Sequence, residues 1–128
     1  MIHYGFTKEL DIPYETVVEL VREELKKEGF GILTEIDVKE TMKEKLGLDM
    51  NNYIILGACN PQNAYKSILT EENIGLMLPC NVIVYQKGSK TVLSGGATIS
   101  MQMIENSKLQ IVAEAVEAQL KKSFDAVK

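Results

Sequence analysis

The sequence predicts an α+β fold in which a mostly antiparallel sheet packs against helices. Apolar segments of strand length alternate with segments of helical periodicity along the whole chain, with no linker and no internal repeat. The last two predicted strands, 81–86 and 91–99, are separated only by the turn 87–90, so they form an antiparallel hairpin. This hairpin argues against a doubly wound parallel sheet.

Length and composition indicate one globular domain covering residues 1–128. The chain is 45% hydrophobic and 25% charged, and a chain of this size buries roughly 68% of its unfolded surface without disulfides or metals. Its longest apolar runs fall far short of the roughly 20 residues that span a bilayer. The first residues show no basic region leading into an apolar stretch, so no secretory signal is predicted and cytoplasm is the expected location.

The charge balance predicts that the protein does not bind nucleic acid. The 14 Lys and Arg residues oppose 18 Asp and Glu residues, giving a net charge of −4, and Arg22 is the single arginine. Nucleic-acid binding draws on concentrated basic residues that neutralise phosphates, and the doublets at 26–27 and 121–122 stand among acidic residues. We therefore expect neither a nucleic acid nor a membrane as a partner.

The N-terminal part is predicted to form a strand and a helix. Residues 3–7 form the first strand, and Pro13, whose fixed φ suits a first helical turn, begins the helix. Gly29 ends this helix as a left-handed cap, because a residue without Cβ adopts that conformation at no cost. The apolar residues of the helix recur at helical spacing: Val17, Val18, Val21 and Leu25.

The middle of the chain adds two strands and two helices. Residues 30–38 alternate as a strand, residues 39–46 form a charged helix closed by Gly47, and the apolar run 53–58 is typical of a central strand covered on both faces. Asn60 and Pro61 then begin a helix that reaches residue 69 and precedes a loop at 70–79. Alternation in 30–38 gives one face Ile32, Thr34, Ile36 and Val38, and the other face Leu33, Glu35 and Asp37.

The C-terminal stretch 104–124 has the longest helical pattern. Just before it, Gly95 and Gly96 are expected to bend the last strand. The predicted order of elements is therefore β-α-β-α-β-α-β-β-α. The apolar stripe of the last helix consists of Leu109, Val112, Val116, Leu120 and Phe124, widened by Ala113 and Ile111.

Two cysteines carry the strongest functional signal. Cys59 ends a strand just before the helix start at Asn60, where the helix dipole favours a thiolate over a thiol. Cys80 begins the next strand, beside Asn81. If these strands are antiparallel neighbours, both thiols meet at one edge of the sheet with the amides of Asn60 and Asn81, and this cluster binds a small ligand, a soft metal ion or an electrophile. Alternatively, both cysteines are ordinary core residues.

Two carboxylates form a second candidate site. Glu35 and Asp37 are two residues apart on a predicted strand, so they share one face with their bases roughly 6 to 7 Å apart. Such a pair acts as a general acid or base or holds a divalent cation, whereas its structural role is to keep an open sheet face hydrated. A small enzyme with Glu35 or Asp37 as its base is therefore a further alternative.

The remaining motifs predict little chemistry. His3, the only histidine, cannot form a multi-histidine zinc site, although it is able to join Cys59 and Cys80 in a mixed ligand set. The chain contains neither a G-x-S-x-G sequence nor a Walker sequence. The sequence therefore predicts no hydrolase triad and no nucleotide-binding loop.

The apolar segment 74–78 lies in a predicted loop and needs cover from water. It either folds back on the core or contacts a second copy of the chain in a homodimer. The adaptable side chains of Met101, Met103 and Ile104 are expected to extend the same patch.

Three segments together resemble a known family. They are GFGILTEIDV at 29–38, ILGACNP at 55–61 with Ala64, and IGLMLPCNVIV at 74–84, and they resemble the domain of unknown function 302 family of bacteria and archaea. The resemblance implies a compact α+β domain similar to a single copy of the TATA-binding-protein-like fold with extra helices, commonly associating as a dimer. It implies no DNA binding, because function belongs to sites rather than to folds.

The sequence thus leads to one leading hypothesis and one alternative from a different class. The leading hypothesis is a cytosolic protein that binds a small ligand or metal ion at Cys59, Asn60, Cys80 and Asn81, with Glu35 and Asp37 as further candidates. The alternative is a homodimeric interaction module whose cysteines are structural. Neither hypothesis names a substrate or a cofactor.

Overall fold

The computed structural model describes residues 5–96 and 104–128 and contains one five-stranded sheet. All neighbouring strands are antiparallel, in the order β1-β5-β4-β3-β2, which confirms the predicted α+β class. The strands are β1 (Phe6–Leu10), β2 (Gly31–Asp37), β3 (Tyr53–Cys59), β4 (Cys80–Lys87) and β5 (Lys90–Gly95). The helices are α1 (Tyr14–Lys27), α2 (Val38–Leu46), α3 (Pro61–Thr70), the 3₁₀ helix η1 (Glu72–Met77) and α5 (Ser107–Asp125).

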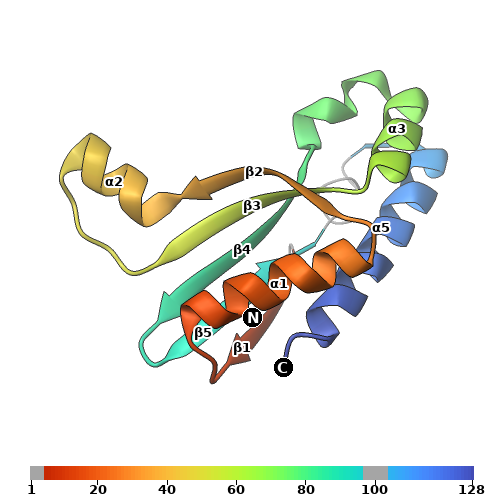
Figure 1. The fold of residues 1–128 in the computed structure, drawn as a ribbon. Helices are drawn as coiled ribbons and strands as arrows, with labels where there is room; N and C mark the ends of the chain where they lie inside the picture. The colour runs from red at the N-terminus through yellow and green to blue at the C-terminus, as the bar shows by residue number, and fades with distance from the viewer. Residues whose placement is uncertain (1–4, 97–103) are drawn as a thin grey trace.

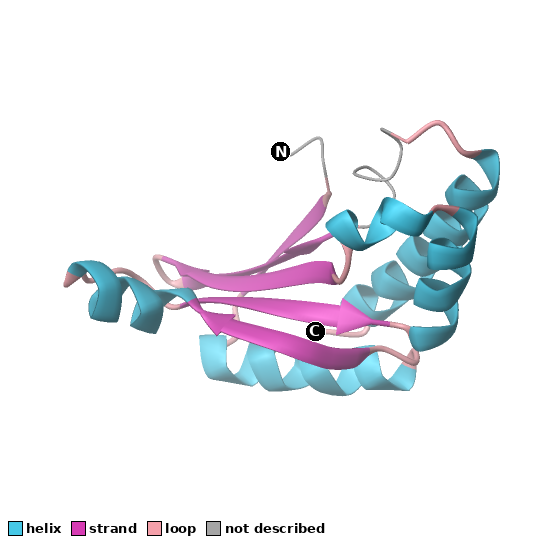
Figure 2. Cartoon of the chain, turned by 90° about the horizontal axis from the view of Figure 1, so that it is seen from above, coloured by secondary structure: helices cyan, strands magenta, loops and turns pink. Residues whose placement is uncertain are grey.

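Helix α1 lies across one face of the sheet and α5 packs beside it, while α3 and η1 stand at one end and α2 projects at the other (Figure 1, Figure 2). The predicted spacing of α1 is confirmed, because all four of its predicted apolar residues are buried. Burial of each large aliphatic side chain contributes roughly 1.5–3 kcal/mol, so this layer is the main source of stability. The core between the layers includes Val17, Val21, Leu25, Leu56, Val82, Val84, Leu93, Leu120 and Phe124.

Helix ends follow the predicted capping signals. Gly29, after α1, and Gly47, after α2, have φ values of 83° and 67°, in the left-handed region where glycine carries no Cβ penalty. Asn60 caps α3 through its side-chain oxygen, which accepts a hydrogen bond from Asn63 N at 3.2 Å. Asp37 caps α2 in the same way through Glu40 N at 3.0 Å.

Strand β2 differs from the predicted alternation. A bulge between Ile32 and Thr34 inserts one extra residue opposite β3, so Ile32 lies opposite Ala58 and Thr34 lies opposite Gly57. Ile32 therefore packs on the core, whereas Thr34 and Ile36 lie on the other face of the sheet. The prediction that Ile32, Thr34 and Ile36 share one face was wrong, because one inserted residue exchanges the faces beyond it.

Other element boundaries also differ. The described first strand is Phe6–Leu10, which extends past the predicted end at residue 7, while residues 3 and 4 of that prediction lie outside the described residues. The predicted loop 70–79 contains η1. Strand β3 has neighbours on both sides, as predicted, but Tyr53 and Ile55 are only half-buried on its second face. Helix α5 begins at Ser107, and Ile111 is 69% exposed rather than part of the buried stripe. Residues 97–99 of the last predicted strand lie outside the described residues.

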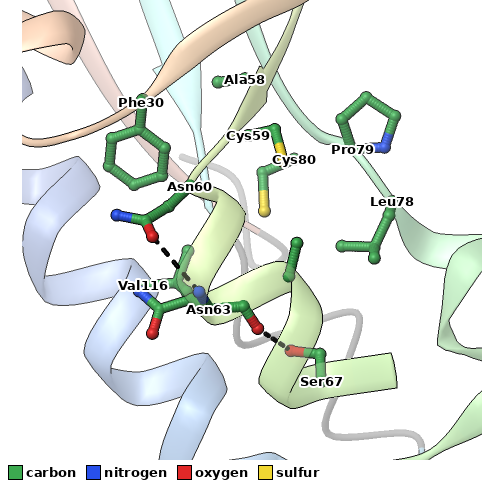
Figure 3. A pocket seen from close by; sticks show the side chains of 11 residues that line it. Phe30, Ala58, Cys59, Asn60, Asn63, Ser67, Leu78, Pro79, Cys80 and Val116 are labelled. Carbon is green, nitrogen blue, oxygen red and sulfur yellow. Dashed lines mark hydrogen bonds between the residues drawn. The ribbon is translucent and has the colours of Figure 1, made fainter. Parts of the chain in front are cut away.

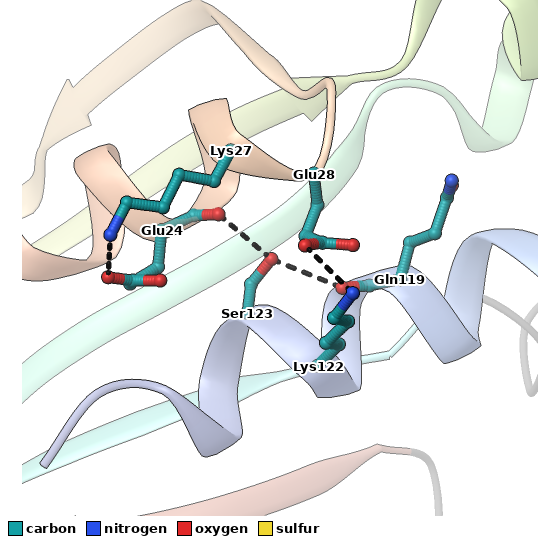
Figure 4. Close-up of polar contacts among 6 residues, drawn as sticks. All are labelled: Glu24, Lys27, Glu28, Gln119, Lys122 and Ser123. Carbon is teal, nitrogen blue, oxygen red and sulfur yellow. Dashed lines mark hydrogen bonds and ion pairs between the residues drawn. The ribbon is translucent and has the colours of Figure 1, made fainter.

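Polar contacts join α5 to α1 and to β1. The Ser123 hydroxyl lies 3.2 Å from its acceptor Glu24 O of α1, and 3.1 Å from Gln119 O of its own helix (Figure 4). Lys8 of β1 donates from Nζ to Phe124 O at 3.0 Å and also to Val127 O. This lysine satisfies carbonyl groups at the carboxyl end of α5, where the helix dipole favours a positive charge.

Close packing at the sheet requires glycine at two positions. The Phe124 ring lies against β5 at Gly95, where an added Cβ would come within 2.9 Å of Cζ. At Gly57 an added Cβ would lie 2.0 Å from Thr34 Oγ1 and 2.7 Å from Pro79 Cγ. Within the described part of the chain, no helix is both long enough and apolar enough to cross a bilayer.

Candidate functional site

The register of β3 and β4 brings the two cysteines to one end of the sheet. The strands are antiparallel neighbours, and Ala58 lies directly opposite Cys80. Cys59 is the last residue of β3 and Cys80 the first of β4, so both stand where the chain leaves the sheet. The predicted meeting of the two strand ends is confirmed, and the two side chains lie next to each other beside the first turn of α3 (Figure 3).

Both cysteines line one small cavity of about 20 Å³ (Figure 3). Such a volume suits one guest of the size of a water molecule. The cavity lies between the sheet end, α3 and α5, and none of its described lining residues carries a formal charge. Its walls are Phe30, Ala58, Cys59, Asn60, Asn63, Ala64, Ser67, Leu78, Pro79, Cys80 and Val116.

Three amide and hydroxyl atoms of the cavity lining have hydrogen-bond partners within the protein. Asn60 Oδ1 accepts from Asn63 N, Asn63 Nδ2 donates to Gln119 Oε1 at 3.1 Å, and Ser67 Oγ donates to Asn63 O at 2.8 Å. Cys59 and Cys80 are free thiols. The two free sulfur atoms therefore give this cavity a pair of soft donor atoms for a ligand.

Burial keeps both thiols protonated at neutral pH. It raises the pKa of Cys59, and it raises the pKa of Cys80 to about 11, with a further increase from the charge of a Cys59 thiolate. The raised pKa of Cys59 runs against the thiolate expected there, because burial removes hydration that stabilises the charged form.

The remaining predicted site residues lie outside the cavity lining. Asn81 is exposed and lies opposite Gly57 in the sheet. Glu35 and Asp37 share one face of β2, as predicted, but they are four and six residues along from Gly31, which pairs with Cys59. At about 3.3 Å per residue they are roughly 13–20 Å from the cysteine end.

Glu35 and Asp37 instead have structural partners. Glu35 Oε1 pairs with Arg22 Nη2 of α1, and Asp37 caps α2. A sequence-based search missed Tyr14 in this cluster, whose pKa is raised to about 12 by burial and by the charges of Asp37, Glu15 and Glu35. The two carboxylates therefore hold α1, β2 and α2 together at the edge of the sheet.

No conventional metal centre is present in residues 5–96 and 104–128. There, no three or more His, Cys, Asp or Glu side chains lie close enough together to share a metal ion. His3, the third ligand considered with Cys59 and Cys80, lies outside these ranges.

Several cavity residues were not predicted from the sequence. Asn63 and Ser67 follow the Asn60 cap at helical spacing and form the inner side of α3, a signal that the sequence already contains. Phe30, Leu78 and Val116 come from three distant segments, and only the tertiary fold brings them to the cavity.

Together, these features define a small antiparallel α+β protein with a two-thiol cavity at one end of its sheet. The family described as "Domain of unknown function DUF302" matches residues 6–127, and the chain belongs to this family. The crystal structure of an uncharacterised conserved DUF302 protein from Bacillus stearothermophilus is similar, with a TM-score of 0.92 and 30% sequence identity. That match covers 99% of this chain and 100% of the Bacillus chain. No curated protein matches the sequence.

Proposed function

We propose that the protein binds a small ligand in the cavity between Cys59 and Cys80, with Asn60 at its rim. One observation carries this proposal: two thiols from separate strands line the same cavity. Free cysteines that serve only as core residues need no shared cavity, and they are usually sealed among apolar side chains. Here both are only partly buried, and Asn60, Asn63 and Ser67 give the opposite wall a polar side.

The cavity favours a small, uncharged or soft ligand. Neutral thiols and apolar walls offer no compensating charge to a hard anion or a hard cation. Its volume excludes large organic molecules unless the walls move apart. The ligand therefore binds through sulfur, while the apolar walls of Phe30, Leu78 and Val116 exclude water.

Thiol reactivity in the native protein tests this proposal. We expect methyl methanethiosulfonate, which is small and uncharged, to modify both cysteines, and the bulky anion of Ellman's reagent to react far more slowly. Peptide mass spectrometry identifies the modified residue. Two thiols that stay fully protected from the small reagent until the protein unfolds would contradict the proposal.

A cavity-filling variant provides a matched comparison. Ala64 lines the cavity from α3, so Ala64→Leu is expected to slow modification of the cysteines. Ala118→Leu adds the same side chain on the exposed surface of α5 and is expected to leave the rates unchanged. Equal rates in both variants would show that the reagent does not enter through this cavity.

A second candidate function, homodimerisation, is favoured by the inverted burial of α3. This helix turns Asn63 and Ser67 inward, whereas Tyr65 and Leu69 are 65% and 67% exposed. Leu76 of the neighbouring η1 is 90% exposed, although Ile74 in the same segment is fully buried against α5. The predicted apolar patch 74–78 therefore divides between core and surface, and we propose that its exposed part contacts a second copy of the chain.

The oligomeric mass tests this second candidate. Leu76→Asp is expected to convert a dimer into a monomer, because it places a charge in the apolar contact. Leu46→Asp is the matched control, since Leu46 is also exposed but lies on α2 at the opposite end of the molecule (Figure 1). Multi-angle light scattering measures both masses. A Leu76→Asp protein with the mass of the parent would rule this contact out.

A further inference from the structure

The cavity offers a ligand two soft donor atoms, the sulfur atoms of its cysteines. Asn60 Oδ1, Asn63 Nδ2 and Ser67 Oγ are engaged in hydrogen bonds within α3 and with Gln119 of α5, whereas Cys59 and Cys80 provide two sulfur atoms. No carboxylate and no imidazole belongs to the described lining. The space between the walls suits a guest of atomic rather than molecular size.

These observations together select a class of metal ion. Zinc in structural sites takes four ligands, and calcium and magnesium take several oxygen ligands including carboxylates, whereas this cavity supplies two sulfur atoms, two amide groups and no carboxylate. Thiolates are soft ligands that select Cu(I) among the common biological metals. A monovalent d¹⁰ ion is also satisfied by two sulfur ligands in a linear arrangement, which matches the number of cysteines.

We propose that Cys59 Sγ and Cys80 Sγ together bind one soft monovalent metal ion, Cu(I) or its redox-inert analogue Ag(I), in this cavity. This inference rests on the proposed ligand-binding function and names its ligand class. Binding forms two metal–sulfur bonds and breaks two S–H bonds, and both protons pass to solvent. The metal is neither oxidised nor reduced, and the bound unit of two thiolates and one cation has a charge of −1.

The fold provides partial compensation for that charge. Asn60 caps α3 directly after Cys59, so the positive end of the helix dipole lies beside the sulfur atoms (Figure 3). The apolar walls exclude water and hard competing ligands from the metal. Cys59 directly precedes the cap of α3, whereas Cys80 is the first residue of β4.

Competition for copper tests the proposal. The reduced protein is titrated anaerobically with Cu(I) in the presence of bicinchoninate, whose coloured complex reports the copper that it retains. We expect the protein to withdraw one copper ion per chain. Cys59→Ser and Cys80→Ser are each expected to lose this binding, while Thr70→Ala, which changes α3 outside the cavity lining, keeps it. X-ray absorption at the copper edge is expected to show two sulfur neighbours.

Several outcomes would overturn the proposal. Copper binding that survives the double variant C59S/C80S would place the metal elsewhere. A single variant that binds copper as well as the parent would rule out ligation by two sulfur atoms. No withdrawal of copper from a protein whose thiols react with methyl methanethiosulfonate would reject the metal but keep the ligand-binding function. Thiols that neither react with methyl methanethiosulfonate nor bind copper would reject both the ligand-binding function and the metal site. Cys59→Ala and Cys80→Ala repeat the test if a serine variant fails to fold.

Discussion

Cys80 lies directly opposite Ala58 in the β3–β4 ladder, and this pairing determines where both thiols lie. Cys59, the next residue after Ala58, then reaches the same end of the sheet as the first residue of β4. Strand alternation alone would direct neighbouring residues to opposite faces. Because both strands end here, the two side chains are able to line one cavity with α3.

The contribution of Cys80 to the unfolding free energy is expected to be lost at alkaline pH. In the unfolded chain the thiol ionises near pH 9, whereas burial raises its pKa to about 11 in the folded protein. The unfolded state therefore loses its proton first, so this contribution is complete below pH 9 and disappears as pH rises through 11.

Urea unfolding of the parent and of Cys80→Ala at pH 8 and pH 11 measures this effect. The gap in unfolding free energy between the two proteins is expected to narrow by about 2 kcal/mol at the higher pH. Tyr14, which also titrates in this range, is common to both proteins and cancels. A gap that stays constant would mean that the Cys80 thiol ionises equally in both states.

Asn60 is expected to stabilise α3 through its cap. Asn60→Ala removes the oxygen that accepts from Asn63 N and is expected to cost about 1 kcal/mol of unfolding free energy. Asn60→Asp retains an acceptor and serves as the control, with most of the stability preserved. Chemical denaturation compares the three proteins, and an alanine variant as stable as the parent would show that the cap contributes nothing.

Gly57 is expected to tolerate no side chain. In Gly57→Ala the new methyl group meets Thr34 Oγ1 and the Pro79 ring, so β2 or the β4 entry must shift, at a cost of roughly 1–3 kcal/mol. Gly75→Ala is the matched control, because nothing lies within 4 Å of its added Cβ. Thermal unfolding distinguishes them, and equal midpoints would contradict the packing at Gly57.

Lys8 is expected to stabilise the carboxyl end of α5. Lys8→Met keeps most of the apolar stem but removes the donor to Phe124 O and Val127 O, which is expected to cost about 1 kcal/mol. Lys121→Met changes an exposed lysine of α5 and is expected to be nearly neutral. Because Lys8 is partly buried, added salt is expected to reduce the loss of unfolding free energy in Lys8→Met only slightly.

Local chemistry explains which parts of this fold were predictable. The caps at Gly29, Gly47 and Asn60 follow from backbone and hydrogen-bonding preferences of single residues, so each lies where the sequence places it. The meeting of Cys59 and Cys80 needed only the antiparallel pairing of β3 and β4. These features depend on neighbours that are close in the chain or in the ladder.

Features that depend on tertiary contacts were not predictable in the same way. The β2 bulge at Leu33 follows from how β2 fits against β3, and alternation alone gave Ile32 and Thr34 the same face. The protonated state of Cys59 depends on burial by segments distant in the chain. Helical periodicity placed Ile111 in the core, but α5 is covered on one side only, and Ile111 lies outside that side.

Helix α2 has a consequence for local dynamics, because it buries none of its residues. A helix of nine residues is marginal in water when tertiary packing does not support it. Its amide protons are therefore expected to exchange with deuterium through brief local openings, while those of β3 and β4 exchange only when the whole domain opens. We therefore expect α2 to open separately from the end of the sheet that holds the thiols.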